Sequence, residues 1–79
     1  MLILYWRPTC PFCHRVLDTA GELGLTLEKK DIADPTVAAE LVKRGGRQQV
    51  PYLVDTERGV EMYESMDIDA YLRAQYAKS

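Results

Sequence analysis

Two cysteines near the start of the chain, Cys10 and Cys13, constrain its fold more than any other feature. They are the only cysteines among 79 residues. Small secreted domains usually stabilise thin cores with several disulfide bridges, and this chain cannot do so. A bridge within the pair would close so short a loop that it would restrict the unfolded chain very little. The pair is therefore a weak structural bridge, part of a zinc site, or a redox couple.

Composition narrows the class of protein. The chain is 47% hydrophobic and 28% charged, which is typical of a globular domain, and its length predicts a single domain over residues 1–79. A net charge of −2 does not favour binding to nucleic acid or to an anionic membrane, since both bind to basic protein surfaces. The apolar run over residues 2–6 is too short to span a bilayer or to act as a signal peptide. We therefore expect a cytoplasmic monomer with no membrane or nucleic-acid partner.

Apolar spacing, glycines and prolines predict strands and helices in the order β-α-β-α-β-β-α. Because a helix joins the first two strands, they should be parallel, whereas the last two should form an antiparallel hairpin. Strands are expected at residues 2–6, from residue 25 towards residue 32, at 51–54 and at 60–63. Helices are expected from Pro11 to a stop at Gly24, from Asp34 and Pro35 to Gly45, and from a cap at Ser65 onwards.

The position of the cysteine pair favours redox chemistry. Cys10 falls between a strand and a helix, where free backbone N–H groups and the helix dipole stabilise a thiolate. Arg7 adds a positive charge nearby, and Cys13 follows one turn later on the same face, so it can resolve a mixed disulfide. Cys10 is thus the predicted nucleophile and Cys13 the resolving thiol. A pair of inert reduced thiols is the alternative that the helix start disfavours.

A zinc site is not expected. Zinc needs four ligands, and His14 follows Cys13 directly, so the two are badly directed for the same ion. His14 is predicted to be an exposed helix residue rather than a catalytic base. No metal is predicted.

Two segments carry a family resemblance. Residues 9–15 (TCPFCHR) and 43–51 (KRGGRQQVP) resemble a dithiol glutaredoxin, and the likeness covers nearly the whole chain. It implies the thioredoxin fold, an α/β fold in which a four-stranded mixed sheet is flanked by three helices. It also implies a cis peptide bond before Pro51, leaving the backbone of Val50 free to pair with a ligand. The family uses glutathione as a co-substrate and holds no tightly bound cofactor.

Three departures from that family stand out. Phe12 occupies the place of a usual tyrosine, and Gln49 the place of a usual threonine. Glu64 and Ser65 look instead like the N-terminal domain of glutathione transferases, in which such a pair binds the γ-glutamyl end of glutathione. A helix start offers N–H groups to a carboxylate, and Glu64 can accept from an ammonium group. The glutathione contacts that the resemblance implies are Arg7, Phe12, Gln49, Val50, Pro51, Glu64 and Ser65.

The sequence therefore favours a glutathione-dependent thiol–disulfide oxidoreductase that reduces protein disulfides and glutathione mixed disulfides. One alternative is a glutaredoxin-like electron donor reduced by thioredoxin reductase. Another is a non-catalytic module that binds glutathione, or that bridges an iron–sulfur cluster through Cys10; Pro11 disfavours the cluster, because cluster-binding relatives typically have glycine there. A complete transferase is not expected, because no helical second domain follows residue 79. The expected partners are glutathione and disulfide-containing or glutathionylated proteins.

Overall fold

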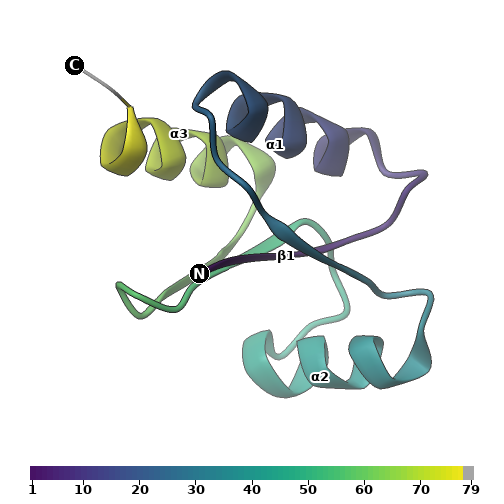
Figure 1. Cartoon of the computed structure of the whole chain (residues 1–79). Coiled ribbons are helices and arrows are strands. Elements are labelled where there is room, and N and C mark those ends of the chain that lie inside the picture. The colour runs from purple at the N-terminus through teal and green to yellow at the C-terminus, as the bar shows by residue number, and fades with distance from the viewer. Residues whose placement is uncertain (78–79) are drawn as a thin grey trace.

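A computed structural model describes residues 1–77. Within that range the chain forms four strands and three helices in the predicted order (Figure 1). Helices α1 and α3 lie together on one side of the sheet, and α2 covers the other side. The elements are β1 (Leu2–Trp6), α1 (Pro11–Glu22), β2 (Glu28–Asp31), α2 (Pro35–Gly45), β3 (Tyr52–Asp55), β4 (Val60–Tyr63) and α3 (Ser65–Tyr76).

The sheet has the strand order β2-β1-β3-β4 among the described residues. Strand β1 pairs in parallel with β2 and antiparallel with β3, with Leu4 opposite both Lys29 and Leu53. Strands β3 and β4 form the antiparallel hairpin, with Leu53 opposite Met62. The predicted mixed sheet flanked by helices on both faces, the thioredoxin fold, is therefore confirmed.

The apolar run in β1 is unbroken because helices cover both faces of the sheet. Side chains alternate along a strand, so Leu2 and Leu4 join the core under α1 and α3. Ile3 and Tyr5 join the core under α2. Central β3 is likewise buried at every position. This burial fixes the register of the two central strands, since a slip of one residue would exchange their faces.

The second strand begins later than predicted. Residue 25 was expected to open it, but β2 starts at Glu28. The N–H of Leu25 instead donates to the carbonyl of Ala20, 2.8 Å away, and Gly24 adopts a φ of 70°. These two features close the C-terminal turn of α1. The N–H of residue 25 is therefore used within this turn and is not available to pair in a strand. Strand β2 itself is charged, as suits an edge strand.

The helix starts differ in how they are capped. Pro11 opens α1 after Cys10, and Asp34 caps α2 by accepting from the N–H of Thr36 at 2.9 Å, as predicted. The predicted cap at Ser65 is wrong. Glu64 occupies the cap position of α3 with a φ of 71° and makes no side-chain capping bond in the described part of the chain, and Ser65 is the first helical residue. Because the backbone turns at Glu64 through a positive φ, Ser65 is the first residue of the helix and not its cap.

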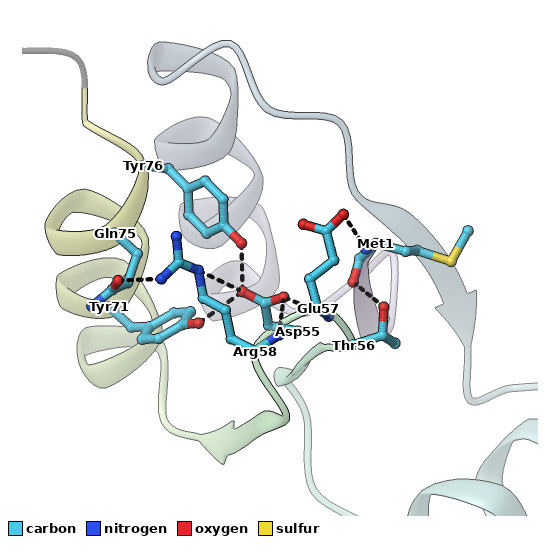
Figure 2. Close-up of polar contacts among 8 residues, drawn as sticks. All are labelled: Met1, Asp55, Thr56, Glu57, Arg58, Tyr71, Gln75 and Tyr76. Atoms are coloured by element: carbon cyan, nitrogen blue, oxygen red, sulfur yellow. Dashed lines mark hydrogen bonds and ion pairs between the residues drawn. The ribbon is translucent and has the colours of Figure 1, made fainter.

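A buried carboxylate ties the β3–β4 hairpin to the last helix (Figure 2). Asp55 is fully buried and accepts hydrogen bonds from the hydroxyls of Tyr71 and Tyr76. It also accepts from the backbone N–H groups of Glu57 and Arg58. Burial disfavours the charged carboxylate, but these hydrogen bonds outweigh that effect and hold the pKa of Asp55 below its ordinary value. The network fixes the C-terminal half of α3 against the sheet.

Candidate functional site

The two cysteines lie at the start of α1, at the end of the sheet where β1 stops. Cys10 is the N-cap residue, and its Sγ accepts from the N–H of Cys13 at 3.4 Å. Both are free thiols; Cys10 is half-buried and Cys13 is fully buried. The N–H of Cys10 donates to the carbonyl of Arg7 at 3.1 Å, which folds the preceding loop against the helix start. The thiols thus occupy the positions that the sequence predicts.

The environment of Cys13 keeps that thiol protonated. Burial raises its pKa to about 12, the backbone N–H of Arg7 acts in the opposite direction, and the neighbouring Cys10 adds to the rise. Cys10, by contrast, is partly accessible and receives an N–H from the first turn of a helix. The start of a helix is a position at which backbone N–H groups and the helix dipole generally favour thiolates. The asymmetry suits a nucleophile at Cys10 and a proton-carrying second thiol at Cys13.

His14 holds the loop in front of Cys10. Its Nε2 donates to the carbonyl oxygen of Pro8 at 2.5 Å, and its ring meets the Trp6 ring edge-on at 5.8 Å. The side chain is exposed, as predicted. These two contacts fix the loop that precedes Cys10. Within residues 1–77 no cluster of three or more histidine, cysteine or acidic side chains is placed to hold a metal ion.

A groove of about 510 Å³ opens beside this helix start. It brings together six of the seven predicted glutathione contacts, and Arg7 does not line it. Arg7 instead lies exposed on the loop before Cys10, and its contact to a ligand carboxylate stays a prediction. Neither cysteine lines the groove, but Phe12, which lies between them in the sequence, does. The lining residues are Phe12, Arg15, Gln49, Val50, Pro51, Glu64, Ser65, Met66 and Asp67.

The floor of the groove has the predicted backbone conformation. The Val50–Pro51 peptide bond is cis. The β1–β3 ladder begins only at Tyr52, so the N–H and C=O of Val50 lie outside the sheet pairing. An extended ligand can pair with such an edge as a short additional strand.

The opposite wall of the groove is the turn into α3. Glu64 combines a φ of 71° with a ψ of 117°, a conformation that costs a non-glycine residue about 1–3 kcal/mol. Its Oε1 accepts from Nε2 of Gln49 at 3.1 Å. The first turn of α3, including buried Ser65, lines the groove, and the N–H groups at a helix N-terminus favour anions. The start of α3 therefore presents an anion-stabilising end to the groove.

Three lining residues were missed by the sequence analysis: Arg15, Met66 and Asp67. Arg15 follows Phe12 by three residues on α1, a spacing that places both on one helix face. Met66 and Asp67 stand in the first turn of α3 directly after Ser65. Helical spacing from Phe12 was the available signal for Arg15, and a place beside Ser65 in the first turn of a predicted helix was the signal for Met66 and Asp67.

Comparison with known proteins settles the family. A family model described as glutathione S-transferase, N-terminal domain, matches residues 4–79. The chain belongs to this family. It is therefore a thioredoxin-fold protein related to glutathione enzymes, as the segment around Glu64 and Ser65 suggested.

Solved glutathione transferases share the architecture of this domain. A delta-class transferase from Nilaparvata lugens is 30% identical, with a TM-score of 0.84, and the match covers 100% of this chain and 38% of that one. An epsilon-class transferase from the housefly Musca domestica is 29% identical, with a TM-score of 0.83, over 100% of this chain and 37% of that one. A homologue from Drosophila mojavensis, solved with bound glutathione, is 27% identical, with a TM-score of 0.84, over 99% of this chain and 36% of that one. This chain thus spans little more than a third of these transferases.

The glutaredoxin resemblance is also found, at lower coverage. Glutaredoxin 3 of Escherichia coli strain K12 is 31% identical over 51 residues, which are 63% of this chain and 61% of that protein. The domain therefore combines transferase-like overall structure with local likeness to a glutaredoxin. No helix among the described residues is long and apolar enough to cross a membrane.

Proposed function

We propose that this domain is a glutathione-dependent thiol–disulfide oxidoreductase of the cytoplasm, acting on protein disulfides and on glutathione mixed disulfides. One observation carries the proposal: Cys10 caps α1 and accepts the N–H of Cys13 at 3.4 Å. A partly accessible thiol at a helix start is the arrangement that activates a cysteine for disulfide exchange. The half-buried Cys10 and fully buried Cys13 then take different roles.

The first step is attack on a glutathione mixed disulfide. The Cys10 thiolate displaces the protein thiolate, so a Cys10–glutathione disulfide forms as the substrate disulfide breaks, and the released thiolate takes a proton. A second glutathione thiolate then attacks the glutathione sulfur of that disulfide. It forms oxidised glutathione and regenerates the Cys10 thiolate. One free glutathione is thus consumed: it joins the glutathionyl group taken from the substrate to form oxidised glutathione, and the substrate gains a thiol.

Protein disulfides require the second cysteine. Cys10 first forms a mixed disulfide with one substrate sulfur, while the other substrate sulfur leaves as a thiolate and takes a proton. Cys13 then loses its proton and attacks Cys10 Sγ, which releases the substrate sulfur that was bound to Cys10 as a thiol. The resulting Cys10–Cys13 disulfide is reduced by two glutathione molecules. The 3.4 Å hydrogen bond from the Cys13 N–H to Cys10 Sγ supports that exchange, because it holds the Cys10 side chain against the residue that carries the second thiol.

The groove supplies binding for the glutathione portion. Its γ-glutamyl carboxylate would meet the N–H groups at the start of α3 and the Ser65 hydroxyl, and its ammonium group would meet Glu64. Its peptide would pair with the free backbone edge of Val50. This orientation would direct its sulfur towards Phe12, which lies between the two cysteines in the sequence. Bound glutathione in the Drosophila mojavensis homologue supports the ligand class.

The test is paired serine substitution in an assay that couples glutathione, glutathione reductase and NADPH to a glutathionylated peptide. Cys10→Ser should abolish turnover, and Cys13→Ser should leave reduction of the glutathionylated peptide largely intact while reducing activity on a protein disulfide. Turnover by the Cys10→Ser variant would refute the assignment of the nucleophile. Replacing glutathione and its reductase with thioredoxin reductase tests the alternative electron donor.

The transferase family match favours one second candidate, a domain that activates glutathione for addition to an electrophile. In that reaction the glutathione thiolate itself attacks the electrophile, and Cys10 carries no covalent intermediate. Conjugation of 1-chloro-2,4-dinitrobenzene that survives Cys10→Ser, without mixed-disulfide reduction by the wild-type domain, would favour this candidate over the oxidoreductase.

A further inference from the structure

Tyr63 is the last residue of β4 and directly precedes Glu64 in the groove. Its hydroxyl donates to the carbonyl of Arg47 at 2.7 Å and accepts from the N–H of the same residue at 3.1 Å. The Arg47 guanidinium lies over the Tyr63 ring, 4.5 Å from its centre. One side chain therefore satisfies both backbone groups of a residue in the loop that leads from α2 to the cis proline.

The fit around this hydroxyl is tight. A Cβ atom built on Gly45 would lie 2.2 Å from the Tyr63 oxygen and 2.7 Å from Cζ of its ring. Such contacts do not occur between real atoms, so glycine at this position makes room for the tyrosine. On its other side the ring packs against Tyr52 with centroids 4.4 Å apart. Tyr63 is thus held in one place by α2 and by β3.

Its position links the two walls of the groove. The loop of residues 46–50 carries Gln49 and Val50, and the opposite wall begins at Glu64. Tyr63 precedes Glu64 by one residue and anchors the loop through Arg47. The 3.1 Å bond from Gln49 to Glu64 makes a second connection across the same gap. Without the hydroxyl, the backbone of Arg47 would lose both partners and the loop would gain freedom.

We propose that Tyr63 is a positioning residue for glutathione: it fixes the loop whose Val50 backbone pairs with the ligand, relative to the Glu64–Ser65 wall that receives the γ-glutamyl end. This inference rests on the proposed function for the identity of the ligand. It assigns Tyr63 no contact with the reacting sulfur atoms. The ligand-binding step should therefore depend on the hydroxyl, whereas the thiol chemistry should not.

Tyr63→Phe tests the proposal, with Tyr52→Phe as its matched control. Tyr52 is a tyrosine on the neighbouring strand that packs on the same ring, but its hydroxyl donates to Glu61 at 2.7 Å and not to the loop. Both variants keep their rings, and circular dichroism and thermal melting establish that they fold. Calorimetry with S-methylglutathione measures binding without turnover. Amide hydrogen exchange of residues 47–50 measures the order of the loop.

Tyr63→Phe should weaken S-methylglutathione binding and raise the KM for glutathione by about fivefold to tenfold, with kcat and the rate of Cys10 alkylation unchanged. Exchange at residues 47–50 should become faster in Tyr63→Phe and stay at the wild-type rate in Tyr52→Phe. Unchanged exchange in that loop, or binding within about twofold of wild type, would overturn the positioning role. A wild-type domain that bound no S-methylglutathione would instead overturn the proposed function, while the exchange comparison would still decide whether Tyr63 orders the loop.

Discussion

Gln49 and Glu64 meet across the groove, with the side-chain amide of Gln49 donating to Oε1 of Glu64 at 3.1 Å. The bond joins the loop before the cis proline to the strained turn that opens α3. It also orients a carboxylate whose backbone stands in a left-handed conformation. Strain of this kind persists where the surrounding structure determines it, and it is concentrated at binding sites.

Replacing Glu64 with glycine should affect stability and binding in opposite directions. Glycine adopts a φ of 71° without steric cost, so Glu64→Gly should raise the free energy of unfolding by about 1 kcal/mol. The same change removes the carboxylate and should weaken S-methylglutathione binding about tenfold. Urea denaturation and calorimetry measure the two effects.

Glu64→Gln is the control, because it keeps the backbone strain and a side-chain oxygen for Gln49. Its stability should stay close to wild type, and its loss of binding should be smaller than that of Glu64→Gly. A Glu64→Gly variant that was destabilised would show that the turn is not strained in the folded domain.

The fold was predictable because its signals are local. The unbroken apolar run in β1 and the Asp34–Pro35 helix start each depend on neighbouring residues, and both predictions are confirmed. The two errors arose where tertiary geometry overrides a local signal. Residue 25 belongs to the turn that closes α1. Ser65 is the first residue of α3 because Glu64, with its positive φ, occupies the cap position. Propensity alone does not predict a positive φ at a glutamate.

The site was predictable only in part, for a related reason. The cysteine pair and the Val50–Pro51 turn are contiguous motifs, so the sequence indicated them directly. The contact between Tyr63 and Gly45 joins residues from different elements, and only the folded chain brings them together. Arg7, which the family resemblance implied as a glutathione contact, does not line the groove.

Gly45→Ala should destabilise the domain although it lies in a helix, where alanine is normally favoured. The new methyl group would overlap the Tyr63 hydroxyl and ring, and overpacking of this kind costs about 1–3 kcal/mol. Gly21→Ala is the matched control: it lies in α1 with no atom within 4 Å of the new methyl. It should stabilise the domain by up to about 1 kcal/mol. Thermal melts of the two variants should therefore shift in opposite directions, and a stabilised Gly45→Ala would contradict the close contact.

Asp55 should make stability depend on pH in the acid range. Its pKa is depressed on folding, so the unfolded chain binds the proton more readily. The stabilisation is fully present above the unfolded pKa of about 3.9 and is lost as pH falls through the lower folded value. Urea midpoints measured between about pH 6 and pH 2 should therefore decline steeply at the acid end.

Asp55→Asn should flatten that decline and cost about 2–3 kcal/mol at neutral pH, because an amide cannot accept all the hydrogen bonds that converge on the carboxylate in Figure 2. Asp18→Asn, at an exposed position of α1, serves as the control and should retain the wild-type profile. An unchanged acid profile in Asp55→Asn would place the origin of the pH dependence elsewhere.

Alkylation should distinguish the two thiols. Cys13 is fully buried and its pKa is raised to about 12, so at pH 7.5 it is a protonated, inaccessible thiol. Iodoacetamide should therefore label the reduced native domain once, at Cys10, and should label Cys13 only after unfolding. Mass spectrometry of tryptic peptides identifies the labelled residue.

The Cys13→Ser variant should react at the wild-type rate, whereas Cys10→Ser should be nearly inert. Rapid native labelling of Cys13 would contradict its burial and its raised pKa.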